Sequence, residues 1–65
     1  MYHTHILKEV IIEDNVWIGT HCVILPGVTI KSGSVIGAGC VVTKDTIENG
    51  IYIGIPASLF KMRNI

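Results

Sequence analysis

Three histidines, His3, His5 and His21, are the side chains of this sequence best suited to acid–base chemistry. An imidazole titrates close to neutral pH, so it can take a proton from a hydroxyl group while that group attacks an electrophile. His3 and His5 stand in the first segment, "MYHTHILKEV", whereas His21 stands inside a regularly repeated stretch. The sequence thus offers candidate general bases in two different settings.

The two cysteines, Cys22 and Cys40, are the other groups with reactive side chains. Their separation has no C-x-x-C character, so no metal site is expected from them. They are three six-residue units apart and should stack on the same inner side of a repeating structure. We interpret them as small core residues in a reducing compartment rather than as a disulfide or a catalytic thiol.

A six-residue repeat must provide the elements that position these side chains. Large aliphatic residues recur at that spacing, and a small or medium residue stands two positions before each next one. The aliphatic residues are Ile12, Ile18, Ile24, Ile30, Ile36 and Val42. The smaller ones are Val16, Cys22, Val28, Ser34, Cys40 and Thr46. This alternation predicts an interior too narrow for a second large side chain in each unit.

Each unit also contains a pair of residues typical of a turn. The second members of these pairs are Asn15, His21, Gly27, Gly33, Gly39 and Asp45, which all tolerate positive φ. A position at a corner is enough to account for His21 without any catalytic role. Gly and Pro in so many units exclude an amphipathic helix. The repeat therefore predicts an all-β chain, a parallel β-helix with three sides per coil and complete coils at residues 12–29 and 30–47.

The residues just before the inward aliphatic ones should point outward, and most of them are apolar. They include Ile11, Trp17, Val23, Val35, Val41 and Ile47. A chain of 65 residues rarely buries enough apolar surface alone, so we expect this wall to be an interface between chains. No linker divides the chain, and residues 1–65 are expected to form one domain.

Charge and hydropathy narrow the function classes. Five basic and five acidic residues give a net charge of zero, which offers no basic footprint for nucleic acid. No apolar run approaches the roughly 20 residues of a membrane span. The first segment shows no signal peptide or lipidation motif, so we expect a cytoplasmic protein.

The run "NVWIGTHCVILPGVTIKSGSVIGAGCVVTKD", followed by "IYIGIPAS", closely resembles the hexapeptide-repeat acyltransferases. The likeness is strongest to the branch that holds the galactoside and maltose O-acetyltransferases and the xenobiotic acetyltransferases. It implies a left-handed parallel β-helix of about two to three coils and a homotrimer. It also implies acetyl-CoA as co-substrate, a sugar or other hydroxyl acceptor, and no metal.

The resemblance also assigns roles to individual residues. The catalytic histidine of the family precedes the "VWIG" coil, which favours His5 in "Thr4-His5-Ile6"; His3, or no competent base, stays open. The residues implied to contact CoA are Trp17, Thr20, Ala38, Thr43, Lys44 and Lys61, with Arg63 beside Lys61 as a further phosphate contact. The family often has Lys or Arg where Ser58 stands, and "Gly54-Ile55-Pro56-Ala57" resembles its motif that closes the last coil.

The sequence departs from the family at its N-terminal end. Many relatives carry a longer acceptor-binding loop after the histidine, whereas only "ILKEVI" intervenes here, and relatives carry further coils or a helical segment ahead. We therefore expect a chain truncated at its N-terminus. The alternative to an enzyme is a catalytically incompetent β-helix fragment that serves as a structural or oligomerisation module.

Overall fold

The computed structural model describes residues 8–64 of the chain, which form eight β-strands and no helix. The strands are β1 (Ile11–Ile12), β2 (Trp17–Ile18), β3 (Val23–Ile24), β4 (Thr29–Ile30), β5 (Val35–Ile36), β6 (Val41–Val42), β7 (Gly50–Ile53) and β8 (Ser58–Met62). They are arranged in three sheets, with strand orders β1-β4, β2-β5-β7-β8 and β3-β6.

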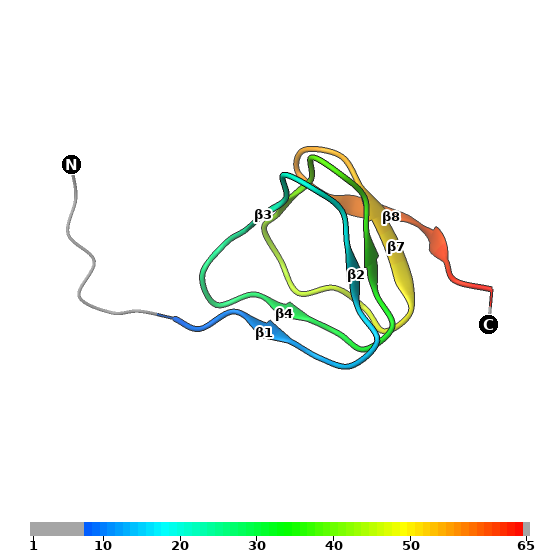
Figure 1. The fold of residues 1–65 in the computed structure, drawn as a ribbon, viewed down its shortest axis with the longest axis horizontal. Coiled ribbons are helices and arrows are strands. Elements are labelled where there is room, and N and C mark those ends of the chain that lie inside the picture. Colours follow the sequence, from blue (N-terminus) through cyan, green and yellow to red (C-terminus); the bar gives the residue numbers. More distant parts are fainter. Residues whose placement is uncertain (1–7, 65) are drawn as a thin grey trace.

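The chain winds around a triangular outline, with one sheet on each side (Figure 1). All three sides pair in parallel with the same register, since Ile11 lies opposite Thr29, Trp17 opposite Val35 and Val23 opposite Val41. Every one of these pairs is 18 residues apart, which is three six-residue sides. The predicted parallel β-helix and its first coil are confirmed.

Residues with positive φ form the corners of the first coils. Asn15 and His21 have φ of 59° and 60°, and Gly27, Gly33 and Gly39 share this left-handed conformation. Corners that stack one coil apart also bond to each other, because the Gly39 N–H donates to the Thr20 carbonyl at 2.9 Å. The interpretation of His21 as a corner residue is confirmed.

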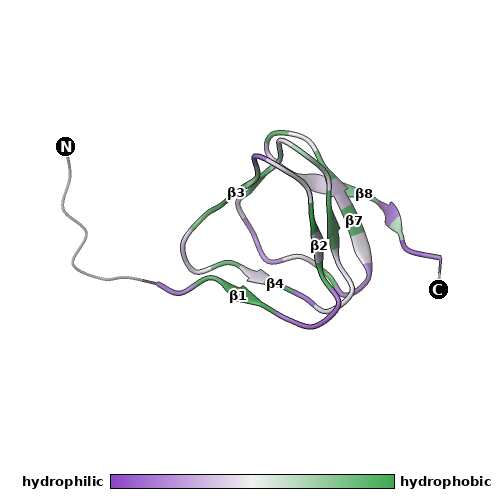
Figure 2. Cartoon of the chain, in the orientation of Figure 1, coloured by the Kyte–Doolittle hydropathy of each residue, from purple (hydrophilic) through white to green (hydrophobic). Residues whose placement is uncertain are grey.

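The core lies inside the triangle and consists of predicted inward residues together with Tyr52, which was not predicted. Ile30, Ile36, Val42, Cys40 and Val28 are buried, and Cys22 packs against them beside Cys40. By contrast Ile12 and Ile18 keep 50% and 39% of their surface exposed, because no described coil stacks on that end of the helix. Figure 2 shows that the three sides are largely hydrophobic while polar residues gather at the corners.

The outward residues form the expected apolar wall. Trp17 is 70% exposed, and Val23, Ile11 and Ile47 are each about half exposed. No helix in residues 8–64 is long and apolar enough to cross a membrane.

The sequence prediction is wrong at one corner, in the second coil. Asp45 does not adopt positive φ; Asn49 does instead, at 63°. Val35 pairs with Ile51, only 16 residues ahead, so this coil is two residues shorter than the one before it. Residue 48, where the next aliphatic would fall, is a glutamate, and the next large buried side chain is that of Tyr52.

The last residues are more ordered than the short tail that the sequence predicts. β7 continues the second sheet in parallel with β5, and β8 then returns antiparallel to β7. The turn between them covers residues 54–57, where Gly54 has a φ of 101°. The predicted closing role of this motif is confirmed.

Candidate functional site

Trp17 and Lys61 lie on the same outer row of the four-stranded sheet. The row runs from Trp17 through Val35 and Ile51 to Lys61, across β2, β5, β7 and β8. Strands are spaced by about 4.8 Å, so about 14 Å separates the two ends of the row. Lys61 Nζ lies 5.9 Å from the ring centre of its neighbour Phe60. The row therefore combines an exposed indole, an apolar centre and a cation.

Thr20 and Ala38 are brought together at the corner that follows this sheet. Their turns stack directly, and a side chain at Gly19 would lie only 2.6 Å from the Ala38 nitrogen. Nothing lies within 4 Å of the place where a side chain at Gly39 would begin. Gly19 thus lets the two turns stack closely, and Gly39 leaves the space beside this corner uncovered by a side chain.

Thr43 and Lys44 line a surface hollow of about 340 Å³ beside the closing turn. The rest of the lining is Val42, Asp45, Tyr52, Pro56, Ala57 and Ser58. Lys44 supplies a positive charge to the hollow. Ser58 supplies a hydroxyl group at the position where the family often has a second cation, Lys or Arg. The lining thus offers one cation, Lys44, and one carboxylate, Asp45, beside the hydroxyl groups of Thr43 and Ser58.

These three pairs of predicted residues do not share one cavity within a single chain. The hollow is lined by Thr43 and Lys44 but not by Trp17, Thr20, Ala38 or Lys61. The predicted base His5, and its alternative His3, lie outside the described residues, so the relation of the base to the other residues stays a prediction.

Several contacts at the site were not foreseen from the sequence. The carboxylate of Asp45 accepts a hydrogen bond from the Thr29 N–H at 2.8 Å. The Tyr52 hydroxyl accepts one from the Ile47 N–H at 2.8 Å. Arg63 donates from Nη1 to the Gly33 carbonyl at 2.9 Å, which gives this residue a structural task at a corner. The first and the last of these contacts join residues 16 and 30 positions apart, and none of the three leaves a periodic mark in the sequence.

A second hollow, of about 370 Å³, lies on another side of the helix and is lined by Glu13, Lys31, Thr46, Ile47 and Glu48. Lys31 Nζ is 3.9 Å from a Glu13 carboxylate oxygen. Among the described residues there is no group of three or more His, Cys, Asp or Glu side chains that could hold a metal. Cys22 and Cys40 are free thiols, and Cys22 Sγ donates to the Gly37 carbonyl at 3.1 Å.

Comparison with known proteins places this fold in a family. The family model for the bacterial transferase hexapeptide (six repeats) matches residues 9–44. The galactoside O-acetyltransferase of Escherichia coli is 53% identical over 53 residues, which are 82% of this chain and 26% of that protein.

Two solved structures are similar to most of the described coils. A maltose O-acetyltransferase from Clostridium difficile aligns with 89% of this chain and 31% of its own, at 46% identity and a TM-score of 0.85. A hexapeptide-repeat acetyltransferase from Vibrio cholerae, complexed with acetyl coenzyme A, aligns with 85% of this chain and 30% of its own, at 42% identity and a TM-score of 0.83.

The chain spans about a quarter of the length of the curated relatives that it matches. The family model nevertheless covers more than half of the chain, and the solved structures share its fold. The left-handed parallel β-helix implied by the sequence resemblance is confirmed. The chain therefore belongs to the bacterial transferase hexapeptide family.

Proposed function

We propose that this chain is part of an acetyl-CoA-dependent O-acetyltransferase whose acceptor is a hydroxyl group of a sugar or a similar small molecule. The base takes the proton of the hydroxyl, and the oxygen attacks the thioester carbonyl of acetyl-CoA. The bond from carbonyl carbon to sulfur then breaks. The products are the acetyl ester and the free thiol of CoA.

The observation that carries this proposal is the likeness to an acetyltransferase structure in complex with acetyl coenzyme A, which extends over 85% of this chain. The galactoside and maltose O-acetyltransferases among the similar proteins support a sugar hydroxyl as the acceptor. Because the chain covers only part of these proteins, the acceptor is proposed as a class rather than as one molecule.

We assign the general base to His5 and the CoA contacts to Trp17, Thr20, Ala38, Thr43, Lys44 and Lys61. These contacts occupy a sheet face, a corner and a hollow of one chain, which supports a groove that is completed by a neighbouring copy. The arrangement fits a homotrimer, in which each groove lies between two chains.

We place the protein in the cytoplasm. Cys22 and Cys40 stack one coil apart, since Val23 and Val41 pair directly, and both are free thiols. Adjacent thiols stay reduced most readily in a reducing compartment, and acetyl-CoA as co-substrate is consistent with that setting.

A homotrimer is the expected state in solution, because Ile11, Trp17 and Val23 are each at least half exposed and leave apolar surface that water solvates poorly. Equilibrium sedimentation at micromolar concentration should give three times the chain mass. Trp17→Glu should shift the distribution toward smaller species, while Thr43→Ser, a near-isosteric change in the hollow, should not. A stable folded monomer of the unaltered chain contradicts the proposed assembly.

Transfer itself is tested by thiol release from acetyl-CoA in the presence of galactosides, maltose and non-sugar alcohols. We expect release that depends on the acceptor, with an ester product of the acceptor mass plus one acetyl group. A chain that binds CoA and trimerises, yet transfers to none of these acceptors, supports the alternative, a structural module without catalysis.

A further inference from the structure

The corner at residues 43–46 is held differently from the other corners of the helix. The earlier corners bend at residues of positive φ, from Asn15 to Gly39, but no residue from 43 to 46 has this conformation. This corner also belongs to the coil that is two residues short. Its shape therefore has to be fixed by contacts rather than by local backbone preference.

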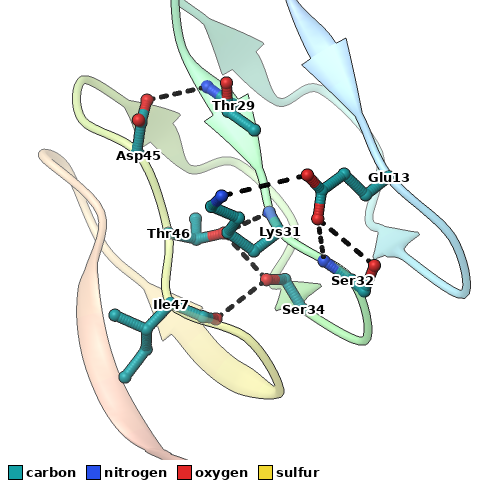
Figure 3. A network of polar contacts seen from close by, with 8 residues as sticks. All are labelled: Glu13, Thr29, Lys31, Ser32, Ser34, Asp45, Thr46 and Ile47. Atoms are coloured by element: carbon teal, nitrogen blue, oxygen red, sulfur yellow. Dashed lines mark hydrogen bonds and ion pairs between the residues drawn. The ribbon is translucent and has the colours of Figure 1, made fainter.

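Asp45 and Thr46 supply these contacts by bonding along the free edge of β4. The Asp45 carboxylate accepts from the Thr29 N–H at 2.8 Å, and the Thr46 N–H donates to the Thr29 carbonyl at 3.1 Å. The Thr46 hydroxyl accepts from the Lys31 N–H at 2.8 Å. As Figure 3 shows, side chains thus take the place that the next strand would occupy beside β4.

Buried hydroxyl groups hold the residue that follows. The Ser34 hydroxyl donates to the Ile47 carbonyl at 3.2 Å, so its oxygen must accept the proton of the Thr46 hydroxyl 2.8 Å away. The Tyr52 hydroxyl accepts from the Ile47 N–H at 2.8 Å. The Thr46 and Ser34 hydroxyls therefore each have both a donor and an acceptor partner.

Lys44 lies between two such anchors. On one side the Val42 carbonyl accepts from the Leu25 N–H at 3.0 Å, and on the other Asp45 is bonded to Thr29. Both Lys44 and Asp45 line the hollow beside the closing turn. The backbone on both sides of Lys44 is thus fixed by hydrogen bonds, at Val42 before it and at Asp45 after it.

We propose that Asp45 is a positioning residue, whose bond to Thr29 sets the place of Lys44 at the hollow and thereby the affinity for an anionic ligand there. This inference rests on the proposed function only for the identity of that ligand, the phosphate-bearing end of CoA. Although Asp45 also lines the hollow, its carboxylate is bonded to the Thr29 N–H, and its positioning effect on the ligand acts through Lys44.

The negative charge of Asp45 should weaken CoA binding, whereas its hydrogen bond to Thr29 should strengthen it. The two effects can therefore be separated by substitution. A carboxylate next to the hollow repels an anion, so its removal alone should tighten CoA binding. Loss of the bond to Thr29 should instead loosen residues 43–46 and weaken binding. Asp45→Asn removes the charge but keeps an oxygen acceptor, whereas Asp45→Ala removes both.

The test compares the unaltered chain with Asp45→Ala, Asp45→Asn and Glu13→Ala. Glu13 is a matched control, because its carboxylate also accepts a backbone N–H, that of Ser32 at 3.0 Å, but it does not line this hollow. The dissociation constant for CoA is measured by calorimetry. Amide exchange at Thr29 and residues 43–46 is measured without ligand, and sedimentation confirms equal assembly.

For Asp45→Ala we expect the lost bond to outweigh the removed repulsion, so that binding weakens by up to about fivefold, the size of one lost hydrogen bond, with faster exchange at Thr29 and residues 43–46. Asp45→Asn should bind CoA at least as tightly as the unaltered chain, and Glu13→Ala should have the same dissociation constant as the unaltered chain. Tighter binding by Asp45→Ala, or unchanged exchange at residues 43–46, overturns the positioning role. If the unaltered chain does not bind CoA, the proposed function fails, while the exchange data still decide whether Asp45 fixes the corner.

Discussion

Ile36→Asp should leave the chain unfolded or insoluble. Ile36 is 1% exposed and lies in the middle of its sheet, between Ile18 of β2 and Tyr52 of β7. Of these neighbours Ile18 carries no polar side-chain atom, and the Tyr52 hydroxyl is already bonded to the Ile47 N–H, so neither supplies a cation to pair with a buried carboxylate. An unpaired buried charge costs several kcal/mol, which is comparable to the roughly 5 kcal/mol at the low end of domain stabilities.

Two further variants show whether the loss of folding comes from the buried charge or from any change at residue 36. Val23→Asp places the same carboxylate on the outer wall, where the side chain is 52% exposed, so the β-helix should still form. Ile36→Val removes one methylene group and should cost only about 1 kcal/mol. Far-ultraviolet circular dichroism and thermal unfolding measure all three. An Ile36→Asp chain with a native spectrum and cooperative unfolding contradicts the inward register.

A milder result is expected nearer the N-terminal end of the helix. Ile24→Asp introduces the same charge at an equivalent position of the first coil, where the side chain is only partly buried. Water can reach this end because no described coil covers it. The loss of stability should therefore increase along the axis from residue 24 to residue 36.

The six-residue period was enough to predict the fold because each unit repeats the same physical requirements. An inward aliphatic, a smaller inward residue and a left-handed corner residue recur together, and from Asn15 to Gly39 every predicted corner has positive φ. The buried side chains of the second coil, such as Ile30 and Ile36, follow directly from this pattern. Because these three requirements are local and recur every six residues, they can be recognised in the sequence alone.

The short corner could not be predicted in the same way. Lys44 and Asp45 fit the turn pattern as well as the earlier pairs do, but the bond from Thr29 to Asp45 joins units 16 residues apart. Whether a side chain replaces a missing strand depends on the edge that it faces, and that edge exists only in the folded chain. The six-residue pattern of the sequence therefore extends to Asp45, whereas the left-handed corners at this spacing do not.

The candidate site depends on pairing of the same non-local kind. Trp17 and Lys61 share one row of the sheet only because β8 folds back on β7 with Lys61 opposite Ile51. The alternation in "SLFKM" does not specify that partner. The resemblance identified these residues, and the hairpin explains how two positions 44 residues apart can serve one face.

His5→Ala should lower acetyl transfer by roughly 100-fold or more, the size expected for the loss of a proton-transfer group. The acceptor hydroxyl is too weak an acid to be ionised at neutral pH, so without the base it attacks the thioester as a poor nucleophile. The affinity for CoA should stay unchanged, because the proposed contacts begin at Trp17. Thiol release at saturating acetyl-CoA and acceptor gives the rate, and calorimetry gives the affinity.

The control for this variant is the histidine in the repeat. Alanine at residue 21 would be strained at a φ of 60°, whereas asparagine is suited to that conformation, as Asn15 shows at 59°. His21→Asn therefore removes an imidazole without disturbing the corner and should keep full activity. If His5→Ala stays active while His3→Ala does not, His3 is the base. If all three variants are as active as the unaltered chain, the proton is taken by a group other than a histidine of this chain, and the proposed mechanism is wrong.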